Sequence, residues 1–273
     1  MSFLCRYYGV SRSGFYAWRE RGHSARVRVD RRLRQAVVRI HRRSRTAYGS
    51  PRVHQALRRE GKRVGVKRVA RLMREAHIKG RAARIYRRLG KLHRFFERIP
   101  NLLQGAPLPQ HIDQVWVADL TYLRIGSSWR YLAAVMDLYS RRIVGWALGH
   151  AKSLALTTRA LQRAIALRRP PAGLVVHSDR GVEYAAYGYQ RVLQTHGLRP
   201  SMNRPYTCQD NAHMESFFHS LKTELVYARV IASDGALNAM LAGYIERFYN
   251  TERLHSSLGY RSPVEFETIN CSH

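Results

Sequence analysis

Three acidic residues stand where carboxylates could do chemistry together. Asp119 lies inside the apolar run WVADLTYL, where an unpaired carboxylate is costly to bury. Asp179 ends the apolar run LVVHSD, and Glu215 falls in the first turn of a helix predicted to begin at Ala212. Oxygen ligands without thiols or histidines at ligand spacing suit hard cations, so this set predicts a site for Mg²⁺ or Mn²⁺.

The chemistry that fits such a site is phosphoryl transfer. Two metal ions roughly 4 Å apart can activate a nucleophile and stabilise the leaving oxygen of an in-line displacement, so we expect two ions in the site. Each acid also has a structural interpretation. Asp119 could pair with a buried arginine, Asp179 could cap the following turn, and Glu215 could be favoured by the helix dipole. All three would have to hold at once, which favours the metal site.

The elements around these acids predict an α/β fold. Three strand-like runs separated by short turns indicate an antiparallel meander, and helices then alternate with two short strands. This order is what a mixed five-stranded sheet flanked by helices requires, and in such a sheet the three acids can converge. The predicted helices are residues 154–168, 187–196, 212–226 and 233–249, and the two later strands are residues 173–178 and 198–202.

The charge of the chain is large and unevenly placed. The 273 residues carry a net charge of +30, and residues 1–110 hold 30 Lys and Arg against five Asp and Glu. A polyanion, nucleic acid first, is the physical partner for such a field. We predict a short helix-turn-helix-like segment (1–25), a helical DNA-binding domain (26–80), a basic linker (81–110) and a catalytic core with a C-terminal helical extension (111–273).

Helix signals support the first two of these segments. Ser11 is predicted to cap a helix that carries Phe15, Tyr16 and Trp18, and Ser50 is predicted to cap a helix that starts at Pro51. A third helix places apolar residues on one face and basic residues on the others. Phosphate contact is the predicted role of its basic residues, although they could form a merely solvated face. These residues are Lys67, Arg68, Arg71 and Arg74.

Several classes of protein are disfavoured. No apolar run approaches the length that spans a bilayer, and the N-terminus lacks a signal peptide's apolar core, so we expect no membrane partner and a cytoplasmic location. The cysteines Cys5, Cys208 and Cys271 are scattered, which argues against a disulfide framework and a structural zinc site.

The residues around the acids resemble a known family. Thirty-five residues separate Asp179 from Glu215, which is similar to the D,D(35)E pattern of retroviral-type integrases and insertion-sequence transposases. The runs YLAAVMDLYSRRIVGWALG, LVVHSDRGVEY, DNAHMESFFHSLKTEL and YIERFYNTERLHSSLGYRSPVEF resemble the second-frame (OrfB) transposase of the insertion-sequence-three family. The resemblance runs from about residue 7 to residue 267.

This resemblance implies a ribonuclease-H-like core in which Asp119, Asp179 and Glu215 bind metal and Lys222 contacts DNA. Lys222 follows Glu215 by seven residues, about two helical turns, so one helix face can carry both. The family also implies a helix-turn-helix that binds the element's ends, metal-dependent 3′-end cleavage and strand transfer, target DNA as second partner, self-association, and possible fusion with the first-frame product.

Other polar residues are assigned structural roles. Asp137 matches a structural position of the family. His177 and Asn211 could orient substrate, but a satisfied histidine and a helix-capping asparagine are the preferred interpretations, and Cys208 is taken as a neutral loop residue. Two functional alternatives stay open, a non-catalytic DNA-binding regulator and a ribonuclease-H-like nuclease without strand transfer.

Overall fold

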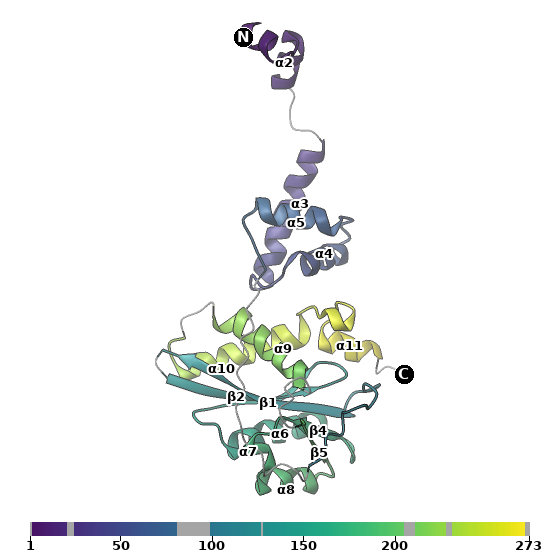
Figure 1. The fold of residues 1–273 in the computed structure, drawn as a ribbon, viewed down its shortest axis with the longest axis vertical. Helices are drawn as coiled ribbons and strands as arrows, with labels where there is room; N and C mark the ends of the chain where they lie inside the picture. The colour runs from purple at the N-terminus through teal and green to yellow at the C-terminus, as the bar shows by residue number, and fades with distance from the viewer. Residues whose placement is uncertain are drawn as a thin grey trace. The chain divides into compact units, whose positions relative to one another are not determined.

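The computed structural model describes residues 2–20, 25–80, 99–126, 128–204, 211–227 and 231–270. The chain divides into two units, Met1–Arg81 and Ala82–His273, and each is described here by itself (Figure 1). Cys208 and most of the predicted linker lie outside the described residues.

Five helices form the described part of the N-terminal unit. They are α1 (Ser2–Tyr7), α2 (Arg12–Glu20), α3 (Ala25–Arg43), α4 (Ser50–Arg59) and α5 (Val66–Glu75). The Ser11 hydroxyl accepts a hydrogen bond from the Gly14 backbone N–H (3.0 Å), so the predicted cap of α2 is confirmed. The predicted cap at Ser50 is wrong, because α4 already includes Ser50 and the extended Gly49 precedes it without a side-chain cap.

Helices α3, α4 and α5 pack around a shared apolar core. The spacing of Leu33, Val37 and Ile40 predicted one inward face on α3, and all three side chains are buried. The other helices add buried residues of the same kind, namely Val53, Leu57, Val69, Leu72 and Met73. The basic residues of α5 therefore lie outside a packed apolar interior.

The second unit is built on one five-stranded sheet of order β3-β2-β1-β4-β5. Strands β1, β2 and β3 form an antiparallel meander, and β4 and β5 run parallel to β1. The predicted mixed sheet is thereby confirmed. The strands are β1 (Val115–Ile125), β2 (Ser128–Asp137), β3 (Ile143–Gly149), β4 (Val175–Ser178) and β5 (Arg199–Met202).

Helices cover both faces of this sheet, with α6 and α8 on one side and α9, α10 and α11 on the other (Figure 1). Helix α6 crosses β3 so closely that a side chain at Gly145 would lie 2.3 Å from the Ala160 carbonyl oxygen, which only glycine avoids. The helices are α6 (Leu154–Arg168), α7 (Val182–Ala185), α8 (Tyr187–Thr195), α9 (Ala212–Leu221), α10 (Asp234–Ala242) and α11 (Pro263–Asn270).

Two of the predicted long helices change their winding part of the way along. Helix α9 continues into a π-helical turn, η2 (Lys222–Val226), and α10 continues into a second one, η3 (Gly243–Tyr249). A short 3₁₀ turn, η4 (Ser256–Leu258), precedes α11. None of the helices within the described ranges is long and apolar enough to cross a membrane.

Candidate active site

Asp119 and Asp179 are brought together by the register of the two central parallel strands. Ala118 of β1 pairs with Ser178 of β4; Asp119 is the next residue of β1, and Asp179 directly follows the last residue of β4. Because the strands run in the same direction, the two aspartates lie next to each other at the carboxyl end of β4. Both side chains are partly buried.

The electrostatics of Asp119 reflect this convergence. Burial, followed by the negative charges of Asp179 and Glu215, raises the pKa of Asp119 from 3.8 to about 8. A hydrogen bond from the Leu120 backbone N–H (2.7 Å) and the charge of Lys152 oppose that rise. The three predicted acids are therefore close enough for their charges to interact.

Asp179 is held by the turn that follows it. Its Oδ1 accepts a hydrogen bond from the Gly181 backbone N–H (3.0 Å), and burial raises its pKa against the effect of Lys152. A side chain at Gly181 would lie 2.9 Å from both Asp179 Oδ1 and Glu183 Oε2. Glycine at this position therefore leaves room for two converging carboxylates, and Glu183 is a neighbour that the sequence analysis did not identify.

Glu215 sits on an anchored helix. It lies in the first turn of α9, exposed, while the neighbouring Phe217 is buried against Tyr249 (ring centroids 4.9 Å apart). Asn211 does not cap α9 with its side chain, contrary to the sequence prediction. Its Nδ2 donates instead to the Ala118 carbonyl oxygen (3.1 Å). This hydrogen bond ties the start of α9 to β1, the strand that carries Asp119.

Lys222 lies at the junction between α9 and the π-helical turn η2. Its Nζ is 4.5 Å from the centre of the Tyr122 ring. Burial lowers the pKa of Lys222, and the negative charge of Asp119 acts in the opposite direction. The side chain is thus a partly buried cation beside the acidic cluster.

Lys152 is a second cation at this edge of the sheet. It comes from the loop between β3 and α6, and its Nζ lies 3.4 Å from Glu183 Oε2. Its charge lowers the pKa of both Asp119 and Asp179. No local pattern marks this lysine in the sequence, because strand pairing and a loop bring it to the acids.

The carboxylates of Asp119, Asp179 and Glu215 do not form a complete metal-coordination site in this structure. Within the described ranges, no three His, Cys, Asp or Glu side chains make up a group arranged to hold a metal ion. The arrangement is one of neighbouring carboxylates, and burial together with their charges raises the pKa of Asp119.

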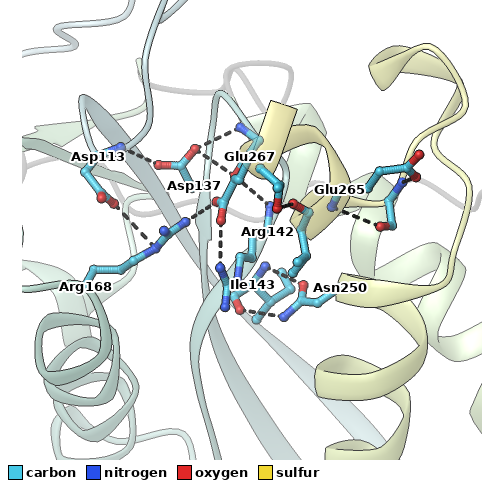
Figure 2. A network of polar contacts seen from close by, with 12 residues as sticks. Asp113, Asp137, Arg142, Ile143, Arg168, Asn250, Glu265 and Glu267 are labelled. Carbon is cyan, nitrogen blue, oxygen red and sulfur yellow. Dashed lines mark hydrogen bonds and ion pairs between the residues drawn. The ribbon is translucent and has the colours of Figure 1, made fainter. Parts of the chain in front are cut away.

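Asp137 belongs to a separate structural network (Figure 2). Its carboxylate is fully buried and accepts hydrogen bonds from the backbone N–H groups of Asp113 (2.7 Å) and Ser140 (2.9 Å). Nearby, Glu267 of α11 forms ion pairs with Arg142 (2.6 Å) and Arg168. The predicted structural role of Asp137 fits these contacts, which join the end of β2 to the segment before β1 and to the turn before β3.

His177 is also satisfied within the fold. It is fully buried on β4, with Nδ1 2.8 Å from the Ser201 hydroxyl and Nε2 2.7 Å from Asn203 Oδ1. The preferred interpretation of a structural histidine is confirmed.

A buried ion pair supports the segment that carries Lys222. Arg253 donates to both carboxylate oxygens of Glu224, at 2.8 Å from its Nη2 and 3.0 Å from its Nε, and the Tyr244 hydroxyl donates to the same carboxylate (2.8 Å). Arg253 also reaches the Ser220 hydroxyl (3.1 Å). The sequence analysis missed this pair, because its members are 29 residues apart and neither lies in an apolar run.

On the helical unit, the four predicted basic residues of α5 fall into two groups. Arg68 and Arg71 form ion pairs with Asp30 of α3 (2.5 and 2.6 Å), so they join two helices. Lys67 and Arg74 are exposed, and their side chains form no hydrogen bond or ion pair with the other residues described. The second group is the more available for phosphate contact.

Comparisons with known proteins place these features in a class. Residues 109–208 and 196–263 each match a model described as an integrase core domain, and residues 28–87 match an HTH-like domain. A chain of the simian T-cell lymphotropic virus intasome in complex with PP2A regulatory subunit B56 gamma has a similar fold, with TM-score 0.50 and 16% identity over 85% of this chain and 74% of that one. The protein is an integrase-core protein with an HTH-like DNA-binding domain.

The relatives narrow this class to one family. The chain is 41% identical over 264 residues to the uncharacterized 31 kDa protein of insertion element IS600 from Shigella sonnei, covering 96% of this chain and 97% of that protein. It is 37% identical over 271 residues to transposase InsF for insertion sequence IS3A from Escherichia coli (strain K12), covering 98% and 93%. The chain belongs to the IS3 family of transposases, as an OrfB protein.

Proposed function

We propose that this transposase cleaves DNA at the 3′ end of its element and transfers the strand at a site formed by Asp119, Asp179 and Glu215. The observation that carries the proposal is the parallel register of β1 and β4, which sets the two aspartates side by side at one edge of the sheet. Glu215 joins them from α9 through its charge on Asp119.

The donor set fits a hard divalent cation. The three ligands are carboxylates, and the raised pKa of Asp119 reflects burial first and then the negative charges of Asp179 and Glu215, which Lys152 offsets only in part. Mg²⁺ or Mn²⁺ would compensate this charge, and two such ions would supply activation of the attacking oxygen and stabilisation of the leaving oxygen. Bound metal would also draw the carboxylates together, since like charges otherwise repel.

The chain's own residues bind and orient the DNA around this centre. Lys222, whose Nζ lies beside the Tyr122 ring, contacts a phosphate next to the acids, and Asn211 holds α9 against β1. Water first attacks the phosphodiester at the element's end, which releases a 3′-hydroxyl. That hydroxyl then attacks a second phosphodiester, so one strand is joined and another 3′-oxygen leaves, with no covalent bond to the protein.

End recognition is assigned to the helical unit. Lys67 and Arg74 contact phosphates of the element's end, whereas Arg68 and Arg71 act mainly by holding α3 and α5 together through Asp30. The target DNA is the second nucleic-acid partner. Self-association, and fusion to the first-frame product, would bring two ends and two active sites together.

The test is a cleavage and strand-transfer assay on labelled end DNA with Mg²⁺. Wild-type protein should give both the nicked and the joined product, and Asp119→Asn and Glu215→Gln should give neither. Glu252→Gln, at an exposed carboxylate, is the control that should keep both. Binding without products would indicate a regulator, nicking alone would indicate a nuclease, and activity in the two triad variants would overturn the assignment.

A further inference from the structure

An exposed pair of aromatic rings lies on the β1–β2 hairpin near the acidic cluster. Tyr122 is 58% exposed and Trp129 is 47% exposed, and their ring centroids are 5.2 Å apart in an edge-to-face arrangement. Large apolar side chains at this exposure contribute little to the core. Two adjoining rings on neighbouring strands form a contiguous apolar surface, which we call the aromatic platform.

Two cations border the aromatic platform. Lys222 Nζ lies 4.5 Å from the Tyr122 ring centre, and the guanidinium carbon of Arg124 lies 5.9 Å from the Trp129 ring centre. The Arg124 Nε–H also donates to the Gly126 carbonyl oxygen (2.9 Å), which fixes the arginine over the hairpin turn. Rings flanked by cations are the combination that binds the bases and phosphates of unpaired nucleic acid.

The aromatic platform is close to the proposed reaction centre. Tyr122 follows Asp119 by three residues on β1, which is about 10 Å along a strand, and the alternation of side chains on a strand directs the two residues to opposite faces of the sheet. Lys222 connects the two places, because it contacts the Tyr122 ring and interacts electrostatically with Asp119. A nucleotide next to a phosphodiester held at the acids is therefore within reach of the rings.

We propose that Tyr122 and Trp129 stack against an unpaired base of the DNA next to the reacting phosphodiester, while Lys222 and Arg124 contact the flanking phosphates. The inference rests on the proposed function, because Asp119 marks where the reacting phosphate lies. A paired base hides its faces in the duplex, so the platform selects DNA whose end is frayed or single-stranded. The positive charge at its border favours this polyanion over an apolar protein surface.

The experiment measures DNA binding rather than cleavage. Full-length protein carrying Asp119→Asn is titrated with end DNA that is either fully paired or unpaired at the nucleotides next to the scissile phosphate, with 2-aminopurine as the unpaired base. Trp129→Ala and Tyr122→Ala should each weaken binding to the unpaired DNA by roughly tenfold or more and remove the fluorescence quenching that stacking produces. Binding to paired DNA should change much less.

Three controls keep the proposal testable. Tyr187→Ala removes a ring that is 79% exposed on α8 and should leave both affinities unchanged. Tyr122→Phe and Trp129→Phe keep a stacking surface, so they should retain most of the preference for unpaired over paired DNA. This result would separate loss of the ring from misfolding. Equal losses on both DNAs, unchanged quenching, or a change of oligomeric state in place of a change in DNA preference would overturn the platform.

Failure of the platform can be distinguished from failure of the triad assignment. If Asp119→Asn retained cleavage, the proposed function would fail, whereas the stacking signal could persist. If the triad variants lost cleavage and the ring variants kept their DNA preference, the platform alone would fail.

Discussion

Replacing Asp119 by asparagine is expected to stabilise the metal-free catalytic unit. In the folded protein, burial and the neighbouring charges raise the pKa of Asp119 from 3.8 to about 8. The ionised carboxylate is therefore less favourable in the folded state than in the unfolded state, and an uncharged amide of the same shape removes that penalty. At about 1.4 kcal/mol per pKa unit, the upper limit of the gain is roughly 6 kcal/mol.

The expected gain is smaller than this limit. Asp119 is partly open to solvent, and its neighbours can relax, so we expect about 2 kcal/mol near pH 8. For a unit of this size that corresponds to a rise in melting temperature of roughly 4 to 8 °C.

The raised pKa of Asp119 also determines how the stability gained in Asp119→Asn changes with pH. Because the folded-state pKa is raised, the penalty is absent below about pH 4, grows as the pH rises, and is complete above about pH 8. Thermal unfolding of the metal-free full-length protein should therefore show a gap between Asp119→Asn and wild type that widens from pH 5 to pH 8.5. Glu252→Gln should show no such gap. A variant less stable than wild type at pH 8, or a gap independent of pH, would refute the reasoning.

Three further predictions concern residues outside the acids. Arg253→Met should destabilise the catalytic unit by about 3 to 5 kcal/mol in denaturant unfolding, since it leaves the buried Glu224 carboxylate without its cation, and adding Glu224→Gln should recover much of the loss; equal stabilities would contradict a buried pair. Asn211→Ala should slow cleavage of end DNA by about tenfold with unchanged DNA affinity, and an unchanged rate would remove its positioning role. Lys67→Ala and Arg74→Ala should each weaken end binding and reduce the salt slope by about one, without a change in melting temperature; salt-independent binding would contradict a phosphate contact.

The mixed five-stranded sheet, with its antiparallel meander, and the convergence of Asp119 and Asp179 could be predicted from the sequence. The apolar runs were long and separated by clear turns, and the carboxyl ends of parallel strands share one edge of a sheet. The pairing of Ala118 with Ser178, which sets the register of the two strands, is given only by the structure.

Contacts between distant segments could not be predicted in the same way. Lys152 reaches Glu183 from a loop, and Arg253 reaches Glu224 across 29 residues, so no helical or strand period relates the partners. Asn211 was assigned as a helix cap because it precedes a helix, but its side-chain amide donates to the Ala118 carbonyl oxygen of β1 instead.

The basic residues of α5 show the same limit. Composition correctly predicted a cationic helix, but it could not reveal that Asp30 binds Arg68 and Arg71. Which arginines remain available depends on how α3 packs against α5, and only the structure contains that information.

The most direct test of the account measures Mn²⁺ binding to the full-length protein. The electron paramagnetic resonance signal of the free ion reports how much Mn²⁺ remains unbound. Wild type should bind Mn²⁺, and Mg²⁺ should compete for the site. Asp119→Asn and Asp179→Asn should each lose most of this binding while remaining folded, and Glu252→Gln should retain it. If either aspartate variant bound Mn²⁺ as wild type does, the carboxylates at the edge of β1 and β4 would not be the metal ligands.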